Sequence, residues 1–207
     1  MTQSVAVIDY GMGNLHSVAS ALKHVGAREV VVSHEPDAIA TASRVVFPGV
    51  GGIRDCMAAI RQLGCDRLLN HVLTVEKKPV LAICVGMQAL MARSEENEGV
   101  ECLGTIPGEV RYFGDQHRDA SGERLKVPHM GWNTIATPDT PHMYFAHSYY
   151  IEKVDNQNKT LSVSTTTYED LSFVSMIQTP NLLATQFHPE KSGEVGLKLI
   201  KDFLSTP

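Results

Sequence analysis

Aromatic residues, basic clusters and long apolar runs are scarce in this chain of 207 residues. Tryptophan occurs once, aromatic residues make up 6% of the chain, and no apolar stretch approaches the length of a membrane-spanning helix. The first residues, MTQSVAVIDYG, lack the basic segment and the long apolar core of a secretory signal. We therefore expect a cytoplasmic protein with no membrane partner.

Positive charge is also in short supply. Lys and Arg number 18 against 23 Asp and Glu, which gives a formal net charge of −5. Nucleic acids bind surfaces on which Lys and Arg cluster. A nucleic-acid partner is therefore not expected.

Cysteine occurs four times, as Cys56, Cys65, Cys84 and Cys102, and never as a C-x-x-C pair. Zinc sites and dithiol redox sites usually contain such a pair. The nine histidines show no His-x-x-x-His spacing either. We therefore expect reduced thiols, no bound metal and no cofactor.

Apolar residues, by contrast, are plentiful enough for one well-packed domain. They make up 43% of the chain, and we expect a single domain over residues 1–207. Short β-branched runs at 4–10, 29–33, 44–49 and 78–84 alternate with helical periodicity at 15–25, 53–63 and 68–73. Strands separated by helices predict an α/β fold with a buried parallel sheet.

The second half of the chain has a different pattern. Short strand-like runs at 109–113, 143–151, 161–168 and 171–177 are separated by polar turns. We interpret them as antiparallel additions to the same sheet. A strand at 182–187 then precedes a helix that Ser192 can cap.

The stretch VLAICVGMQAL at 80–90 places a cysteine where a strand passes into a helix. The sulfur of Cys84 would project at the carboxyl edge of the sheet, beside free backbone N–H groups that stabilise a thiolate. A cysteine in an apolar run is usually packing only. A nearby base would favour the catalytic interpretation.

The stretch QFHPE at 186–190 supplies that base. His188 and Glu190 are two residues apart, so on an extended chain their side chains point the same way. Glu190 can then orient the His188 ring and stabilise its charge. Cysteine, histidine and glutamate in these settings favour nucleophilic catalysis.

Two glycine-rich turns complete the pattern. In FPGVGG at 47–52, the glycines allow backbone amides to face a developing oxyanion, although a plain turn would use the same residues. In DYGMGN at 9–14, Gly11 and Gly13 imitate a dinucleotide fingerprint, but His16 stands at the third glycine position. We therefore expect a tight turn there and no bound dinucleotide.

Taken together, these motifs resemble class I glutamine amidotransferase domains over essentially the whole chain. The class-level motifs are ICVGMQ at 83–88, PGVG at 48–51 and FHPEKS at 187–192. Further motifs, DYGMGNLHS at 9–17, VPHMGWN at 127–133 and YFAHSYY at 144–150, are similar to those of the glutaminase subunits of imidazole glycerol phosphate synthases. The resemblance implies a flavodoxin-like fold, with a mostly parallel sheet flanked by helices and extended by antiparallel strands.

The resemblance also implies roles for particular residues. Cys84, His188 and Glu190 would form a triad that hydrolyses glutamine to glutamate and ammonia through a γ-glutamyl thioester. The backbones of Val50 and Val85 would bind the oxyanion. The residues implied in holding glutamine are Gly51, Gln88, Glu96, Ser148 and Tyr149. Glu96 could equally be a solvated surface charge.

The same resemblance implies a partner, a (β/α)₈-barrel cyclase. This subunit would use the ammonia to convert N'-(phosphoribulosyl)formimino-AICAR to imidazole glycerol phosphate and AICAR, a step of histidine biosynthesis. The residues expected at the interface are Asn14, Trp132, Asn133 and Lys191. An exposed tryptophan is a typical interface anchor, although Trp132 could also belong to the core.

Other functions remain compatible with parts of this pattern. Glutaminase subunits that serve other amidotransferases share the cysteine and the His-x-Glu motif, and one of them could work with a different partner. A cysteine hydrolase can also carry its nucleophile on such a turn, but without the late His-Pro-Glu segment. A non-catalytic interaction module is the third alternative, and the presence of Cys84, His188 and Glu190 argues against it.

Overall fold

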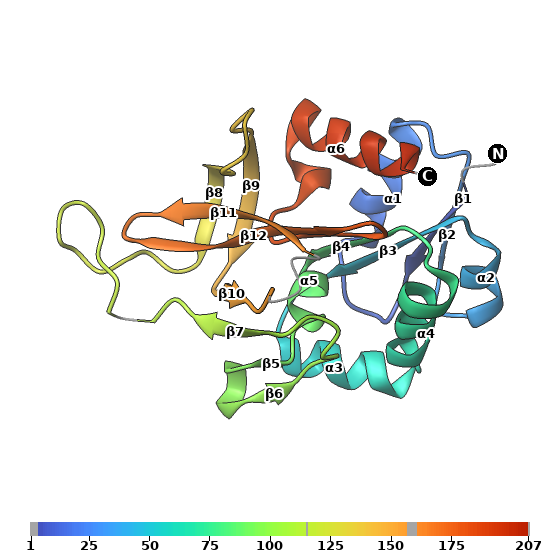
Figure 1. The fold of residues 1–207 in the computed structure, drawn as a ribbon, viewed down its shortest axis with the longest axis horizontal. Coiled ribbons are helices and arrows are strands. Elements are labelled where there is room, and N and C mark those ends of the chain that lie inside the picture. Colours follow the sequence, from blue (N-terminus) through green and yellow to red (C-terminus); the bar gives the residue numbers. More distant parts are fainter. Residues whose placement is uncertain (1–3, 115, 157–160, 207) are drawn as a thin grey trace.

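An eleven-stranded sheet runs through the computed structural model, which describes residues 4–114, 116–156 and 161–206 (Figure 1). Its strands follow the order β2-β1-β3-β4-β13-β12-β10-β7-β5-β6, and β11 pairs with β12. The bounds are β1 Ser4–Ile8, β2 Glu29–Ser33, β3 Arg44–Gly49, β4 Val80–Cys84, β5 Arg93–Ser94, β6 Val100–Glu101, β7 Gly108–Tyr112, β10 Tyr149–Val154, β11 Ser162–Tyr168, β12 Leu171–Thr179 and β13 Leu182–Thr185.

The first half of this sheet is parallel, as the sequence predicts. Strands β2, β1, β3, β4 and β13 are joined by parallel pairing throughout. This is the strand order of flavodoxin-like folds, in which ligands bind at the carboxyl ends of the strands. All five residues of β4 are buried, as expected for a strand covered on both faces.

Helices cover both faces of the parallel strands (Figure 1). Helices α1 and α6 pack against each other on one face, and α3 packs against α4 and α5 on the other. The bounds are α1 Leu15–His24, α2 Pro36–Thr41, α3 Ile53–Gln62, α4 Cys65–His71, a π-helical turn Val72–Glu76, α5 Val85–Ala89 and α6 Gly193–Ser205, with 3-10 turns at Glu96–Glu98 and Pro189–Lys191.

Ser192 has a different role from the one predicted. It stands at the N-cap position of α6, but its hydroxyl makes no capping hydrogen bond. The hydroxyl instead donates to the His188 carbonyl at 2.6 Å and accepts from the Tyr144 amide at 2.9 Å. These two bonds attach the His-Pro-Glu turn to strand β9 (His142–His147).

The segment 143–151, predicted as one strand, is divided between two sheets. Strand β9 (His142–His147) pairs with β8 (His129–Thr134) in a separate two-stranded sheet, and β10 begins at Tyr149 in the main sheet. The prediction of a single strand is therefore wrong. The chain changes partner at Ser148, because His147 pairs with His129 whereas Tyr149 pairs with Tyr112.

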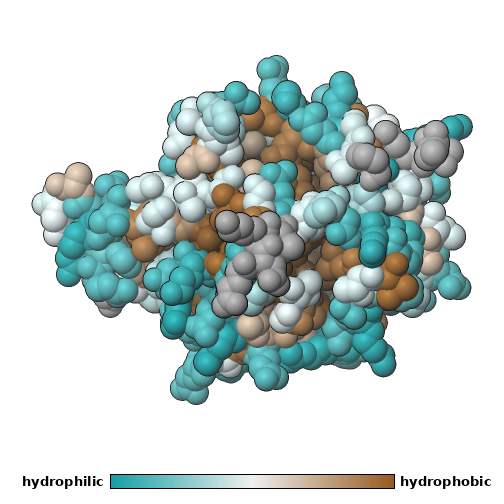
Figure 2. Space-filling view, viewed as in Figure 1, coloured by the Kyte–Doolittle hydropathy of each residue, from teal (hydrophilic) through white to brown (hydrophobic). Residues whose placement is uncertain are grey.

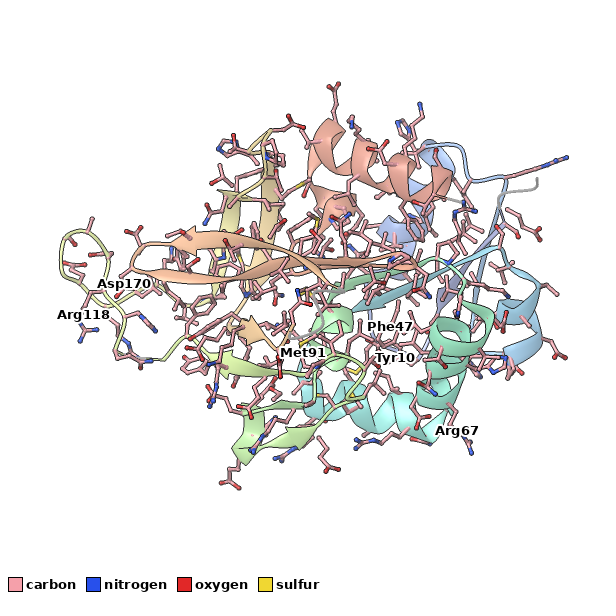
Figure 3. The ribbon with its side chains drawn as sticks, viewed as in Figure 1. Tyr10, Phe47, Arg67, Met91, Arg118 and Asp170 are labelled. Carbon is pink, nitrogen blue, oxygen red and sulfur yellow. The ribbon has the colours of Figure 1, made fainter. Side chains whose placement is uncertain are left out.

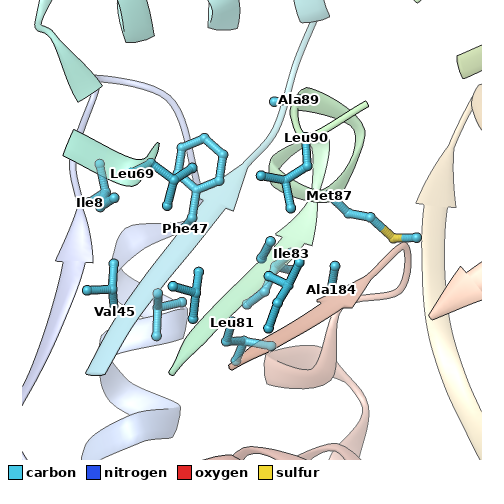
Figure 4. Packing of buried hydrophobic residues seen from close by; sticks show 14 of the residues in the cluster. Ile8, Val45, Phe47, Leu69, Leu81, Ile83, Met87, Ala89, Leu90 and Ala184 are labelled. Atoms are coloured by element: carbon cyan, nitrogen blue, oxygen red, sulfur yellow. The ribbon is translucent and has the colours of Figure 1, made fainter. Parts of the chain in front are cut away.

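The main core lies between the parallel strands and their helices. Phe47 of β3 and Ile83 of β4 are both buried within it (Figure 4). A second cluster under the antiparallel strands is built around Phe113, Phe145 and Phe173. No helix of the described ranges is long and apolar enough to cross a membrane.

Candidate active site

Cys84 occupies a sharp turn between β4 and α5, as predicted. Its backbone angles are φ 55° and ψ −111°, a conformation that side chains rarely adopt and that is often found at functional turns. The sequence permits this turn because Gly86 lies against β3. A Cβ atom at Gly86 would stand 2.1 Å from the Phe47 carbonyl oxygen.

His188 and Glu190 form a buried pair beside this cysteine. The His188 Nδ1–H donates to Glu190 Oε1 at 2.9 Å, and the two side chains are 4% and 1% exposed. Burial lowers the pKa of His188, but hydrogen bonds to Cys84 and Glu190, together with their charges, outweigh it and raise that pKa to about 10. The ring is therefore held as an imidazolium near neutral pH.

One cavity of about 390 Å³ brings most of the predicted site residues together. Glu190 lies outside its lining, behind the His188 ring. A larger cavity of about 680 Å³ lies beside α6, where a hydrophobic hollow shows in Figure 2, but none of the predicted residues lines it. The predicted residues that line the smaller cavity are Val50, Gly51, Cys84, Val85, Gln88, Glu96, Ser148, Tyr149, His188 and Lys191.

The glycine loop that carries Val50 and Gly51 is braced from behind by Tyr10. The Tyr10 hydroxyl donates to the Pro48 carbonyl at 2.8 Å, and its ring packs 5.6 Å from that of Phe47 (Figure 3). Burial raises the pKa of Tyr10 above its usual range, so this hydroxyl stays a donor. Gly51 has φ +95°, a conformation that favours glycine.

Glu96 is more than a solvated surface charge. Its Oε2 accepts the backbone N–H of Ile53 at 3.1 Å, at the first residue of α3. A carboxylate at a helix N-terminus is favourable for the helix. Glu96 thus holds the start of α3, directly after Gly52, while it lines the cavity.

The predicted interface residues differ in how much of them faces solvent. Trp132 is 57% exposed, which rules out a core position, and Lys191 is exposed at the cavity rim. Asn14 is half-buried at the start of α1. The Asn133 amide bonds within the chain, to the Thr167 carbonyl at 3.0 Å and to the His129 ring at 3.2 Å. The interface role of all four stays a prediction.

Sequence reasoning missed several residues near the cavity. His129, His147 and Gln186 are buried polar groups: the two histidine rings bond to each other, and Gln186 accepts from Gln88. Met130 is 64% exposed beside Trp132. Met130 and Trp132 are two residues apart on β8, so their side chains project from the same face of the strand. The motif VPHMGWN could have indicated this spacing.

The other cysteines are unsuited to nucleophilic chemistry. All four cysteines are free thiols, and burial raises the pKa of Cys56, Cys65 and Cys102 to about 11 each. These three therefore stay protonated at neutral pH. Within residues 4–114, 116–156 and 161–206, no group of three or more His, Cys, Asp or Glu is placed to hold a metal ion.

Comparisons with known proteins agree with this geometry. The family model of class-I glutamine amidotransferases matches residues 6–206. The chain is 51% identical to the imidazole glycerol phosphate synthase subunit HisH 1 of Pseudomonas aeruginosa, over 99% of this chain and 98% of that protein. It is 48% identical to the HisH subunit of Acinetobacter baylyi, over 97% of each.

Solved structures share the fold at low sequence identity. A crystal structure of a glutamine amidotransferase superposes with a TM-score of 0.72 at 15% identity, over 97% of this chain and 98% of that one. The structure of PurLQS from Thermotoga maritima gives a TM-score of 0.67 at 16% identity, over 99% and 98%. The α/β fold with its extended sheet is therefore confirmed, and the chain belongs to the class-I glutamine amidotransferases, in the family of the HisH subunits of imidazole glycerol phosphate synthase.

Proposed function

We propose that this chain, as a single domain, hydrolyses the side-chain amide of glutamine with Cys84, His188 and Glu190 and delivers the ammonia to a cyclase subunit. The observation that carries the proposal is that Cys84 and His188 line one cavity, with His188 bonded to the buried Glu190 carboxylate. Sequence identity of about half to HisH subunits supports the same assignment.

In the first half of the reaction, the Cys84 thiolate attacks the carboxamide carbon of glutamine. The negative charge that develops on the carbonyl oxygen is accepted by the backbone N–H groups of Val50 and Val85. The carbon–nitrogen bond breaks, His188 gives its proton to the leaving nitrogen, and ammonia departs. A γ-glutamyl thioester remains on Cys84.

In the second half, neutral His188 takes a proton from a water molecule that attacks the thioester. The carbon–sulfur bond breaks, glutamate leaves, and the thiolate is restored opposite an imidazolium. Glu190 keeps the ring oriented through both halves, because its carboxylate holds Nδ1–H and leaves Nε2 for the reacting groups.

Glutamine is held by the walls of the same cavity. We assign this role to Gly51, Gln88, Glu96, Ser148 and Tyr149, all of which line it. Both N–H bonds of the Gln88 amide have acceptors inside the chain, the Tyr149 carbonyl and Gln186 Oε1, each at 3.0 Å. The Gln88 carboxamide oxygen is therefore the atom that would accept from the α-ammonium group of glutamine.

A dedicated glutaminase needs a partner, because ammonia released into neutral water is mostly protonated and no longer nucleophilic. We assign a (β/α)₈-barrel cyclase to this role, which makes imidazole glycerol phosphate and AICAR from N'-(phosphoribulosyl)formimino-AICAR. The cavity mouth would be the docking face, where exposed Trp132 and Met130 project from β8 and Lys191 stands at the rim. The free cysteines agree with a reducing cytoplasm as the location.

The glycine loop supports a further expectation about activity. Gly49, Gly51 and Gly52 surround the proposed oxyanion donor Val50, and Gly51 has a positive φ. Such a loop can change its peptide orientation at low cost. We therefore expect slow glutamine turnover in the isolated chain and faster turnover when the cyclase carries its ligand.

The test is glutamate release from glutamine by the purified chain, alone and with a cyclase barrel plus its nucleotide substrate. Cys84→Ser serves as the control. Release that rises with the liganded cyclase and vanishes in Cys84→Ser is expected. Glutamate release that is the same with and without the cyclase would support the glutaminase activity but indicate a different partner enzyme. No release under either condition would favour a non-catalytic interaction module.

A further inference from the structure

A continuous set of buried hydrogen bonds ends on the sulfur of Cys84. Gln186 Nε2 lies 3.6 Å from Cys84 Sγ, within the distance for a hydrogen bond to sulfur. Gln186 is fully buried, and it is absent from the mechanism above. Its carboxamide oxygen accepts from Gln88 Nε2 at 3.0 Å.

The orientation of the Gln186 amide is fixed by its neighbours. The Tyr149 carbonyl can only accept hydrogen bonds, so Gln88 must turn its NH₂ group toward it, at 3.0 Å. The second N–H of Gln88 then needs an acceptor, and Gln186 presents Oε1 to it. The remaining end of Gln186, its NH₂ group, faces the Cys84 sulfur.

A second arm of hydrogen bonds anchors the same carbonyl. His147 Nδ1 lies 2.7 Å from the Tyr149 oxygen and must carry the proton, so His147 Nε2 accepts from His129 Nδ1–H at 3.0 Å. His129 Nε2 in turn accepts from the Asn133 amide at 3.2 Å. Burial lowers the pKa of His147 to about 3 and that of His129 to about 4, so both rings stay neutral and keep this polarity.

We infer that Gln186 is a further catalytic residue of this protein, whose side-chain N–H, aimed by Gln88 and the Tyr149 carbonyl, donates a hydrogen bond to the Cys84 thiolate. The inference rests on the proposed function. A hydrogen bond to an ionised group is stronger than one between neutral groups, and here it would be made in a buried site.

This donor acts at two moments of the reaction. Before attack, it stabilises the thiolate together with the His188 imidazolium. When the thioester is hydrolysed, the electron pair of the broken carbon–sulfur bond returns to sulfur. The same N–H then donates a hydrogen bond to the negative charge that develops on the sulfur. Because the amide cannot rotate without breaking its bond to Gln88, the donor needs no reorganisation at either moment.

The test is the pH dependence of Cys84 alkylation by iodoacetamide, read from the mass of the Cys84 peptide. Gln186→Met keeps the length of the side chain and removes the donor. We expect the midpoint of alkylation to move up by about one pH unit, and the rate below the midpoint to fall about ten-fold. Gln186→Asn, which retains a buried amide but withdraws it from sulfur, should give the same shift if Gln186→Met does not fold.

Thr185→Val is the matched control. It removes another buried hydrogen bond of this segment, from the Thr185 hydroxyl to the Phe187 carbonyl at 3.0 Å, without touching the cysteine. An unchanged midpoint in the Gln186 variants, or an equal shift in Thr185→Val, would overturn the inference. Alkylation requires neither glutamine nor a partner, so wild-type protein that fails to hydrolyse glutamine would refute the proposed function separately.

Discussion

Replacing Gly86 by alanine should damage catalysis more than stability. The Cβ atom would stand 2.1 Å from the Phe47 carbonyl oxygen and 3.2 Å from its carbonyl carbon. Real Cβ atoms essentially never come closer than 3.0 Å to a neighbour, so α5 and β3 must separate by about 1 Å. The obstacle is strand backbone inside the core, which has no alternative rotamer to adopt.

The two expected costs differ in size. Overpacking of this kind costs about 1–3 kcal/mol, which a domain with about 5–15 kcal/mol of stability survives. The displaced element, however, begins with Val85 and follows the Cys84 turn directly. A misplacement of about 1 Å at reacting groups lowers the rate by about 100-fold.

Urea unfolding and glutamate release measure the two costs side by side. Gly104→Ala is a suitable control, because Gly104 has φ +67° but nothing within 4 Å of an added Cβ. This control should lose about 1 kcal/mol of stability and keep its activity. A Gly86→Ala protein with wild-type turnover would refute the reasoning, since it would mean that the turn does not depend on the close approach of β3.

Three further predictions concern the groups around the triad. Glu190→Gln removes the anion beside His188, so the pKa of His188 should fall. Glutamine turnover should then drop on the order of 100-fold, and the pH–rate profile should shift. An unchanged profile would contradict the role of the His188–Glu190 pair. Because burial lowers the pKa of His147 to about 3, the unfolded chain binds a proton below about pH 6.5 that the folded chain excludes. Stability measured by urea unfolding should therefore decline as pH falls, by about 2 kcal/mol from this ring at pH 5, and equal stability at pH 7 and 5 would argue against a neutral ring. Tyr10→Phe removes the donor to the Pro48 carbonyl. The free energy of unfolding, measured in urea, should fall by about 1 kcal/mol, and the kcat of glutamate release should be lower. Wild-type values of both would show that the glycine loop does not depend on this hydrogen bond.

The sequence predicts those parts of the molecule that are encoded locally. Strand β4, the turn at Cys84 and the helix after it follow from one short run of residues, and the His188–Glu190 spacing predicts a pair that the structure joins at 2.9 Å. The glycines near Val50 likewise predict a turn from residues that are adjacent in the chain. Each of these features depends on neighbours within a few positions of the chain.

The features that sequence reasoning missed depend on distant residues. Gln186 and Cys84 are 102 positions apart, so no local pattern marks their contact. Ser192 stands at a helix start and is of a residue type typical of caps. Its hydroxyl instead accepts from the amide of Tyr144, 48 positions away, and donates to the His188 carbonyl. The division of 143–151 at Ser148 likewise reflects which strands are available for pairing.

Trapping the covalent intermediate tests the central claim most directly. The purified chain would be mixed with glutamine and the cyclase barrel, quenched in acid and digested. The masses of the cysteine-containing peptides would then be measured by mass spectrometry. The account predicts one γ-glutamyl group on the Cys84 peptide and none on the peptides of Cys56, Cys65 and Cys102, whose thiols burial keeps protonated. Glutamate release with no label on Cys84, or with the label on another cysteine, would contradict it.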